Sequence, residues 1–510
     1  MSQTPQTASY DVVVIGGGIN GAVSAAALSS RGLSVLLVDQ RDFGGLTSSQ
    51  SSNLIWGGIK YLQSYEFGLV FKLSRARARL MRNYPTRIIN MGFFAALGPN
   101  APFGQVLGRF GTLFYWAIGL FSTPMPALFG KAKLKQVEPT VYAENVRGAV
   151  EYFDGVMPDN DSRFVWDFVS RARELGATVR NYHEVDRIKK TSDGFEIGIK
   201  NLIAGEQFDV HAKVIVNAAG PFAKQSNDLV GSTTKKDLVF SKGIHLVVRK
   251  LTSDNRVLTF WDEQGRIFYV IPMHDRSVIG TTDTRVLDPL EEVTDQDREF
   301  VLRQINFSMT LDKPLTVDDI ISERCGVRAL VVDRNKDNSK SDWHKLSRKH
   351  SVEIDPQGVI SILGGKFTDC INVGEEIVHK VKKFTPISSS SKPWFGEEDS
   401  KQKASYEQAA AGLLAQGAIT AQVANQLWRR HGSAAKAILE TLKAQPEARE
   451  LAFEGLAITF AELAFISENE EVKTAEDLLR RRLPIAMARS TQQIKENKKL
   501  QSFLKQQKLS

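Results

Sequence analysis

Three glycines near the start of the chain, Gly16, Gly18 and Gly21, constrain its fold more than any other feature. They follow an apolar run at 11–15 whose β-branched residues predict a buried parallel strand. A stretch of small residues after them suits a helix, and a second apolar run at 34–39 predicts another strand. Strand, glycine turn, helix and strand in this order predict a βαβ unit of the Rossmann type.

The glycine spacing also predicts a ligand. In such a unit the first glycine permits a tight turn, the second lets the backbone approach a pyrophosphate, and the third lets helix and strand pack closely. Asp39 ends the second strand, where its carboxylate accepts hydrogen bonds from ribose hydroxyls. FAD and NAD(P) share this adenine dinucleotide half, so the motif alone leaves both open. Its N-terminal position and the many later strands favour FAD.

The rest of the chain divides into regions of different character. At 510 residues it is too long for one core, so two or three domains are expected. Strand-like runs dominate 235–330, and a Ser- and Pro-rich stretch precedes a final region with few strand signals. The expected fold is α/β, with a Rossmann-type FAD-binding domain, an antiparallel-sheet substrate domain and a helical C-terminal cap domain. The expected boundaries are 8–65, 145–235 and 340–385 for the FAD-binding domain, 66–144 and 236–339 for the substrate-binding and membrane-facing domain, 386–402 for a linker, and 403–510 for the helical domain.

The formal net charge of +8 is concentrated at the C-terminal end. Residues 480–510 contain nine Lys and Arg residues against one acidic residue, Glu496, so the rest of the chain is balanced. A basic tail contacts nucleic acid or anionic lipid, or else it is the solvated end of a helix. The solvated end is the favoured interpretation, and we expect no nucleic-acid partner.

An apolar run at 112–121 raises the question of a membrane. It is shorter than the roughly 20 residues of a spanning helix, so it fits a core helix or a segment dipping into one leaflet. The run alone favours the core. The polar N-terminus shows no secretory signal. The two cysteines, Cys325 and Cys370, suit a reducing compartment and lack metal-ligand spacing, so we expect a cytoplasmic protein without a metal site.

A polar ribbon, "TSSQSSNLIWGGIKYLQ" at 47–63, follows the second strand. Its short hydroxyl side chains can bond phosphate and flavin heteroatoms without bulk. With "GGGINGA", "KGIHLVV", "FYVIPMHDRSVIGTTDT", "GVRAL", "GGKFT", "LWRRHGSAAKAIL" and "TAEDLLRRRLPIAMA", it resembles the FAD-dependent glycerol-3-phosphate dehydrogenases. These belong to the D-amino-acid-oxidase-like flavoproteins. The resemblance runs nearly end to end, with its motifs in order.

The resemblance implies an enzyme that oxidises sn-glycerol 3-phosphate to dihydroxyacetone phosphate by hydride transfer to flavin N5. Lys60, Arg328, Lys366 and Thr368 fall on substrate-binding positions, and several fixed cations suit a dianionic substrate. Arg328 is also expected to act in catalysis. His245 matches the family's candidate base, and the alternative for it is a core histidine bonded to backbone.

The resemblance also implies the cofactor contacts and the partners. Electrons are expected to pass to a quinone or to oxygen, with peripheral contact at the inner face of the cytoplasmic membrane. A homodimer is compatible with the resemblance. Thr281, Thr282 and Asp283 are expected to shape the pocket floor. The motif and the resemblance together imply that FAD is bound by Gly16, Gly18, Gly21, Asp39, Thr47, Ser48, Ser49, Ser51, Ser52, Gly58, Ala219, Gly220, Gly364, Gly365 and Lys366.

Departures from the family's pattern leave the substrate open. Trp56 stands in place of a histidine, Lys60 in place of an arginine, and Asp369 adds a carboxylate after "GGKFT". A lysine keeps the charge but loses bidentate geometry, and a carboxylate beside an anion site repels a phosphate unless it faces away. The alternative function is a flavin oxidoreductase of the same family that acts on another small anionic hydroxy acid, polyol phosphate or amine. A non-enzymatic FAD-binding protein is a third interpretation, which the matched site residues disfavour.

Overall fold

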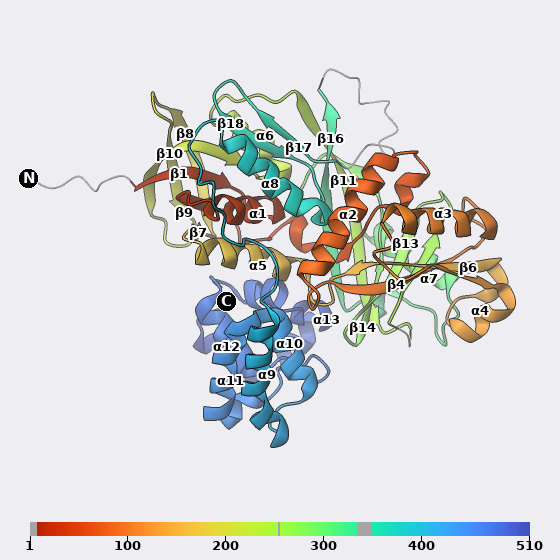
Figure 1. The fold of residues 1–510 in the computed structure, drawn as a ribbon. Coiled ribbons are helices and arrows are strands. Elements are labelled where there is room, and N and C mark those ends of the chain that lie inside the picture. The colour runs from red at the N-terminus through yellow and green to blue at the C-terminus, as the bar shows by residue number, and fades with distance from the viewer. Residues whose placement is uncertain (1–7, 253–254, 335–348, 510) are drawn as a thin grey trace, which may run out of the picture.

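The computed structural model describes residues 8–252, 255–334 and 349–509. These residues form two β-sheets and a separate group of helices (Figure 1). In spatial order, the main path of the first sheet is β17 (Ser351–Ile354), β18 (Val359–Leu363), β10 (Gln207–Asn217), β1 (Ala8–Ile15), β2 (Val35–Val38) and β7 (Thr178–Arg180). Two further strands lie off this path: β9 (Phe195–Asn201) pairs with β10, and β8 (His183–Lys190) pairs with β9. The strands from β18 to β7 pair in parallel. Helix α1 (Ile19–Ser29) crosses from β1 to β2, which confirms the predicted βαβ unit.

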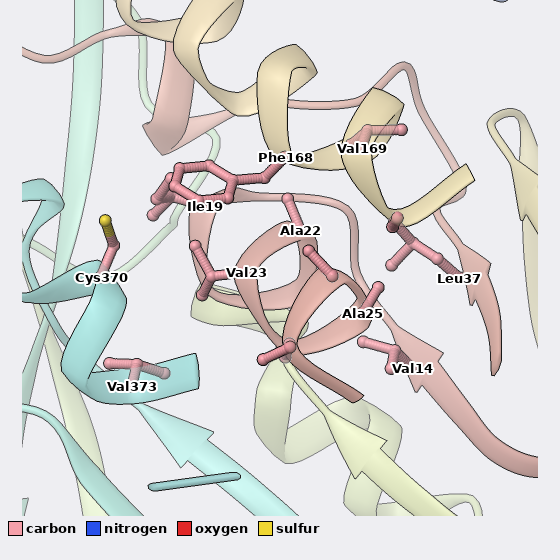
Figure 2. Close-up of a cluster of buried hydrophobic side chains, with 14 of the residues drawn as sticks. Val14, Ile19, Ala22, Val23, Ala25, Leu37, Phe168, Val169, Cys370 and Val373 are labelled. Atoms are coloured by element: carbon pink, nitrogen blue, oxygen red, sulfur yellow. The ribbon is translucent and has the colours of Figure 1, made fainter. Parts of the chain in front are cut away.

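Small side chains let α1 pack between two neighbouring helices. Figure 2 shows Ala22 and Ala25 of α1 among Phe168 of α5 (Asp161–Glu174) and Val373 of α8 (Cys370–Val381). All four side chains are buried in one cluster with the strands below. Close approach also explains the third glycine of the turn. A Cβ atom on Gly21 would lie 1.8 Å from the carbonyl oxygen of Gly16, so any side chain would push the helix off the strand.

The second sheet is mainly antiparallel, and its described residues form ten strands. Its main path is β15 (Thr284–Val286), β11 (Lys236–Arg249), β14 (Arg276–Gly280), β13 (Ile267–Met273), β12 (Val257–Trp261), β4 (Ile89–Ala96), β6 (Gly148–Val156) and β3 (Leu54–Ile55), while β16 (Ser322–Asp333) pairs with β11 and β5 (Ala127–Gly130) with β6. Strands β3 and β6 come from segments that we assigned to the FAD-binding domain, so this sheet draws on both expected domains. The domain boundaries stay a prediction, and the one between 339 and 340 lies outside the described residues.

Helices flank both sheets (Figure 1). Beside the second sheet lie α2 (Phe67–Asn83), α3 (Gln105–Ile118), α4 (Lys131–Val137) and α7 (Asp295–Ser308), while α6 (Ala223–Asp228) packs on the first. Helix α3 and the turn after it contain the apolar run, and the expectation of a core helix is wrong for one face. Tyr115 is buried, but Phe114 is 49% exposed and Phe121 is 62% exposed, because the segment packs on its neighbours through one side. Within the described chain, no helix has the length and apolar character needed to cross a bilayer.

The C-terminal region is helical, as predicted, and forms a layer of its own (Figure 1). It consists of α9 (Ser400–Ala415), α10 (Ala421–His431), α11 (Ala435–Ala444), α12 (Phe460–Asn469), a π-helical turn (Asp477–Arg482), α13 (Ile485–Ala488), α14 (Thr491–Glu496) and α15 (Lys498–Gln506). Its own core lies around Leu427, Leu439 and Leu442, which are buried. A separate core around Leu478 and Leu483 joins it to the second sheet.

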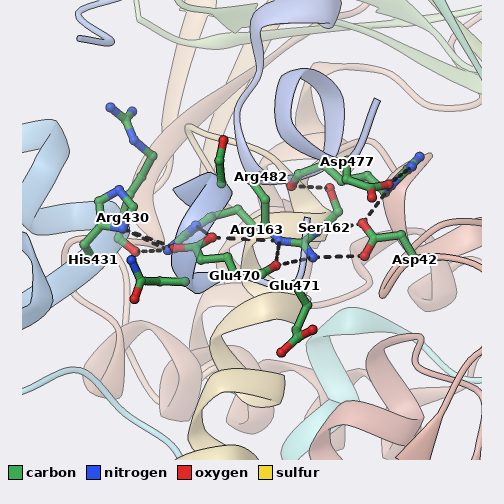
Figure 3. Close-up of polar contacts among 12 residues, drawn as sticks. Asp42, Ser162, Arg163, Arg430, His431, Glu470, Glu471, Asp477 and Arg482 are labelled. Carbon is green, nitrogen blue, oxygen red and sulfur yellow. Dashed lines mark hydrogen bonds and ion pairs between the residues drawn. The ribbon is translucent and has the colours of Figure 1, made fainter. Parts of the chain in front are cut away.

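Buried ion pairs fix this region to helix α5 and to the loop after β2, as Figure 3 shows. Arg482 donates to both carboxylate oxygens of Asp42, at 2.7 and 2.9 Å, and Arg163 bonds Glu470 at 2.5 Å. The interpretation of the basic tail as a solvated helix end is therefore wrong for its arginines Arg481, Arg482 and Arg489, which are buried. Asp42, which binds Arg481 and Arg482, and Asp275, which binds Arg489, lie more than 200 residues away, and no local pattern reveals these contacts. The five lysines after residue 490 are exposed.

Candidate active site

One cavity of about 680 Å³ lies where the two sheets meet and gathers most of the predicted site residues. Among those that line it are Gly16, Gly18, Asp39, Thr47, Ser48, Ser51, Ser52, Lys60, Ala219, Gly220, His245, Arg328, Gly364, Gly365, Lys366 and Thr368. Gly21, Ser49 and Gly58 lie outside it. Gly21 packs α1 against the glycine turn, and the Ser49 hydroxyl donates to the carbonyl of Leu46 at 2.9 Å. The cavity thus joins a nucleotide-type end to a cationic end.

The glycine turn and the end of β2 build the first end. Gly16 has a φ of +101°, a conformation that favours glycine, and a Cβ there would lie 2.6 Å from the carbonyl oxygen of Ala218. The N–H of Gly17 donates to Asp39 Oδ2 at 2.6 Å, and the N–H of Arg41 donates to Oδ1 at 2.7 Å. These bonds fix the carboxylate at the edge of the cavity, where the sequence placed a ribose contact.

The residues present fit a flavin adenine dinucleotide. Gly18 precedes helix α1 and carries no side chain that would block a ligand there. Among the described residues, the side chain of Ser48 lies next to Gly18, and its hydroxyl accepts a hydrogen bond from the Ile19 N–H at 3.1 Å. Asn20 also lines the cavity, and its Oδ1 is buried without a hydrogen-bond partner in the described chain. Its amide group donates to the Gly364 carbonyl at 2.9 Å, which ties the helix start to the "GGKFT" loop. A buried acceptor with no partner points to a ligand that supplies the donor.

The charge of Asp39 predicts how FAD binding depends on pH. Burial raises the pKa of Asp39 to about 6, although the N–H groups of Arg41 and Gly17 favour the carboxylate. Ribose hydroxyls donate to the ionised form, so affinity should fall as pH drops through 6, and be about tenfold weaker at pH 5 than at pH 7. Fluorescence titration of the apoprotein with FAD measures this, with Asp39→Asn as the pH-independent control. A pH-independent wild type, or full FAD retention in Asp39→Ala, would remove Asp39 from the ribose site.

The polar ribbon connects the two ends of the cavity. Thr47–Ser49 forms a short 3₁₀ turn, and the Thr47 hydroxyl donates to the carbonyl of Val327 on β16 at 2.8 Å. The N–H of Ser51 donates to Asp161 at the start of α5, at 2.7 Å. The Ser52 hydroxyl lies 2.8 Å from His245 Nε2. These contacts give the ribbon its fixed course, since its polar groups are bonded to strands and helices on either side.

Strands β11 and β16 carry the cationic end on one shared face. In their antiparallel register His245 lies opposite Arg324, Gly243 opposite Gly326, and Ser241 opposite Arg328. Alternate residues point to the same side of a sheet, so these six residues share a face. The two glycines make the room there. A Cβ on Gly243 would lie 2.1 Å from the Arg328 guanidinium, and one on Gly326 would lie 2.9 Å from the Gln50 carbonyl oxygen.

His245 is buried at 1% exposure between this face and the ribbon. Burial, and after it the cations of Arg324 and Arg328, lower the pKa of His245 well below its usual value. The imidazole is therefore neutral at neutral pH and able to accept a proton. Its Nε2 bonds the Ser52 side chain rather than backbone, and its Nδ1 has no hydrogen-bond partner in the described chain.

Arg328 and Lys366 bring positive charge to the cavity next to His245. Arg328 donates to Thr281 Oγ1 at 3.1 Å and lies 3.6 Å from Asp283, so its fork is held in place. Lys366 Nζ bonds the Tyr61 hydroxyl at 2.5 Å and lies 4.1 Å from the centre of the Tyr61 ring. Lys60 lines the same cavity. The three cations therefore line one cavity, where they can bind a small anion.

The additional carboxylate of Asp369 faces away from this cavity. It lies 2.7 Å from His350 Nδ1 and 3.1 Å from Lys72 Nζ, and it is not among the lining residues. Burial alone would raise its pKa, but His350 and Asn372 hold the pKa of Asp369 below its usual value. The neighbouring Thr368 hydroxyl donates to the carbonyl of Trp56 at 3.1 Å. The departure at 369 thus adds no negative charge to the cavity wall.

Several site residues escaped the sequence analysis. Tyr61 holds Lys366, and Asn20 links the helix start to the "GGKFT" loop. Arg324 and Asp161 form a buried ion pair at 3.1 Å beneath the ribbon. Asn20 lies in "GGGINGA" and Tyr61 lies in "TSSQSSNLIWGGIKYLQ", so the polar side chain of each within a ligand-binding motif was the available signal. Arg324 on β16 and Asp161 at the start of α5 are 163 positions apart in sequence, so only the tertiary fold brings them together.

The comparisons with known proteins identify both regions of the chain. Residues 11–350 match the family described as FAD dependent oxidoreductase, and residues 393–507 match the C-terminal domain of alpha-glycerophosphate oxidase. An aerobic glycerol-3-phosphate dehydrogenase of Bacillus subtilis (strain 168) is 29% identical over 490 residues, which cover 93% of this chain and 86% of that protein. One from Staphylococcus aureus (strain NCTC 8325 / PS 47) is 30% identical over 382 residues, covering 73% and 67%.

Solved structures share the fold. A glycerol-3-phosphate dehydrogenase from Bacillus halodurans complexed with FAD aligns with a TM-score of 0.74 and 23% identity, covering 98% of this chain and 91% of that one. An L-alpha-glycerophosphate oxidase from Mycoplasma pneumoniae with FAD bound aligns with a TM-score of 0.58 and 18% identity, covering 76% and 98%. The FAD-binding fold and the helical C-terminal region therefore both have counterparts of known structure.

Proposed function

This chain belongs to the FAD dependent oxidoreductases, and from that premise we propose that it oxidises sn-glycerol 3-phosphate to dihydroxyacetone phosphate. One observation carries the proposal. Arg328, Lys366 and Lys60 line a single cavity with the neutral base candidate His245. A small alcohol that carries a dianionic phosphate matches that combination of cations and base. The names of the similar dehydrogenases support the same substrate.

FAD is the cofactor of this family, and when bound it supplies the acceptor for the hydride that leaves the substrate carbon. The residues that would hold it are those of the glycine turn, Asp39, the ribbon from Thr47 to Ser52, and the turns at Ala219–Gly220 and Gly364–Gly365. Gly364 and Gly365 have φ values of +66° and +118°, so the backbone there approaches without a side chain between.

The side chains divide the work on the substrate. His245 accepts the proton of the reacting hydroxyl as the hydride leaves, which turns the alcohol into a ketone and keeps the atoms balanced. Ser52 orients the imidazole through its bond to Nε2. Lys366 and Lys60 bind the phosphate as point charges, and Arg328 fixes oxygens near the reacting carbon with its planar fork. Fixed cations position the substrate before reaction and so reduce the entropy lost at the transition state.

The alternative substrates of the same scaffold carry other anionic groups. A small 2-hydroxy acid, another polyol phosphate or an amine would use the same cations, so a substrate panel separates them. With a soluble dye as acceptor, we expect kcat/KM for sn-glycerol 3-phosphate to exceed that for glycerol by at least about 10³-fold, since the two charge contacts of Lys366 and Lys60 with the phosphate are each worth about 2–5 kcal/mol. A higher kcat/KM for a hydroxy acid or an amino acid would replace the proposed substrate.

The exposed face of α3 supports a proposal for the location and the electron acceptor. Val106, Phe110 and Phe114 are 71%, 66% and 49% exposed, and Arg109 stands exposed among them. Apolar side chains beside a cation suit the surface of an anionic bilayer. We propose peripheral membrane contact through this face and a membrane quinone as acceptor. Sedimentation with anionic vesicles tests the contact, and Phe110→Ser with Phe114→Ser should abolish it while soluble-dye activity persists.

A further inference from the structure

We propose that Arg324 is a positioning residue for the reaction, which fixes Ser52 against the His245 imidazole through the 49–53 backbone and places a permanent cation beside that imidazole. The proposal rests on the function proposed above, in which His245 is the base. Arg324 does not line the cavity, so it acts through other residues and touches neither substrate nor cofactor.

The strand register places the two side chains next to each other. His245 on β11 and Arg324 on β16 are direct partners in the antiparallel pairing, and both are 1% exposed. Directly opposite residues have Cβ atoms about 4.5–5.5 Å apart and point to the same face. The guanidinium is thus a near neighbour of the imidazole, in a place that water does not reach.

The guanidinium also anchors the ribbon on both sides of Ser52. Its Nη2 donates to the Ser49 carbonyl at 3.2 Å and to Asn53 Oδ1 at 3.1 Å. The same nitrogen lies 3.1 Å from Asp161 Oδ1, while Asp161 Oδ2 accepts the Ser51 N–H at 2.7 Å. One ion pair therefore holds residues 49, 51 and 53, and Ser52 between them is left to bond His245 at 2.8 Å.

The remaining nitrogens of Arg324 argue against a purely structural ion pair. Its Nε and Nη1 are buried and make no hydrogen bond within the described ranges, and His245 Nδ1 is in the same condition. A guanidinium that served Asp161 alone would form a two-pronged bond with the carboxylate. Here, within the part of the chain that the structure describes, Nη2 makes all three hydrogen bonds of the guanidinium, so Nε and Nη1 leave positive charge unpaired on the buried face that Arg324 shares with His245.

The charges around His245 are dominated by cations. Strand β16 contributes Arg324 and Arg328, β14 contributes the uncharged Gly280, and the ribbon contributes Ser52. The nearby carboxylates are engaged with the arginines, Asp161 with Arg324 and Asp283 with Arg328. Burial and then these two cations hold the pKa of His245 below its usual value. Arg324 thereby adds to the effect of burial in keeping the base neutral and ready to accept the substrate proton.

Two readouts test this role. The first is NMR titration of the His245 imidazole in the FAD-loaded protein, assigned by its loss in His245→Gln. The second is the pH profile of flavin reduction by sn-glycerol 3-phosphate. The double variant Arg324→Met with Asp161→Asn removes both charges, so that no buried carboxylate is left alone. Arg324→Lys keeps the charge but loses the fork. Arg163→Lys, a buried arginine paired with Glu470 away from His245, is the matched control.

We expect the double variant to raise the titration point of the imidazole by at least about one pH unit, and to move the acid limb of the pH profile with it. Arg324→Lys should leave the limb in place and slow flavin reduction about 10- to 100-fold, since a misplaced base is costly. Should the double variant fail to fold, Arg324→Gln with Asp161→Asn makes the same neutralisation and keeps a donor for Asn53.

An imidazole titration unchanged from wild type in the neutral variants would overturn the proposal. The proposal would also be overturned if the Arg324 variants lost thermal stability but kept the wild-type titration and pH profile, which is the result expected for the control Arg163→Lys. If wild-type protein is not reduced by sn-glycerol 3-phosphate at any pH, the proposed function fails, and the imidazole titration still decides the role of Arg324.

Discussion

Replacing His245 by alanine is expected to slow reduction of the flavin by sn-glycerol 3-phosphate about 10²–10⁴-fold, the usual contribution of a positioned base. His245 lines the cavity beside Arg328, is held by Ser52, and carries a lowered pKa that leaves it neutral at neutral pH. Without it, the hydroxyl proton has no acceptor in place as the hydride leaves. Stopped-flow measurement of flavin bleaching under anaerobic conditions gives the rate directly.

The pH profile adds a second requirement to the same prediction. Because burial and then Arg324 and Arg328 lower the pKa of His245, the imidazole stays neutral as pH falls past its usual value near 6.5. The acid limb of flavin reduction should therefore lie below pH 6.5 and disappear in His245→Ala. His211→Ala, at a partly exposed histidine beside Asp193, is the matched control and should keep the wild-type rate. A loss of less than threefold in His245→Ala would assign the proton to another group.

Lys366→Met should lower kcat/KM for sn-glycerol 3-phosphate by about 30- to several thousand-fold, which corresponds to losing a buried charge contact of about 2–5 kcal/mol. Methionine keeps the length and apolar stem of the side chain and removes the ammonium, which is positioned by the hydroxyl and ring of Tyr61. Steady-state kinetics with a soluble acceptor measure the change, and most of it should appear in KM if the charge binds substrate and transition state alike.

Two comparisons show whether the charge acts on the phosphate. Activity with glycerol, which lacks the phosphate, should be nearly the same in Lys366→Met and wild type. Lys213→Met removes an exposed lysine that pairs with Asp11, and it should leave all constants unchanged. If Lys366→Met instead loses its FAD and keeps its KM, the side chain serves the cofactor alone, and Lys60 and Arg328 must hold the phosphate.

Local spacing was enough to predict the nucleotide half of the fold. The glycine turn, Asp39 and the strands around α1 all lie within the first forty residues, and each is a short-range pattern with a steric or hydrogen-bonding cause. The structure gives the steric cause of the third glycine, because a Cβ atom on Gly21 would lie 1.8 Å from the carbonyl oxygen of Gly16. The helical C-terminal region was predictable for a similar reason, since composition and spacing act within a few turns.

Contacts between distant segments were not predictable in this way. The pairing of Arg482 with Asp42 spans 440 positions, and the sequence shows both only as ordinary surface-type charges. The place of Arg324 opposite His245 depends on the register of β11 and β16, which a one-residue shift would reverse. The exposed face of α3 was missed because an apolar run alone does not tell which side will be covered.

Departures from the family's pattern were interpretable only with the structure. Asp369 looked like a charge beside an anion site, yet its carboxylate turns to His350 and Lys72. Trp56 lies 5.9 Å from the Lys366 ammonium, so it contributes an aromatic face where the family has a histidine. Both changes leave the cations of the cavity in place. The proposed phosphate substrate is therefore consistent with them.

Anaerobic titration of the FAD-loaded protein with sn-glycerol 3-phosphate shows whether the cavity binds and oxidises the proposed substrate. We expect prompt loss of the oxidised-flavin absorbance and formation of dihydroxyacetone phosphate equal in amount to the flavin reduced. The proposed function would be contradicted if the flavin stayed oxidised with this substrate while dithionite reduced it fully, since the cofactor would then be competent and the cavity built for a different molecule.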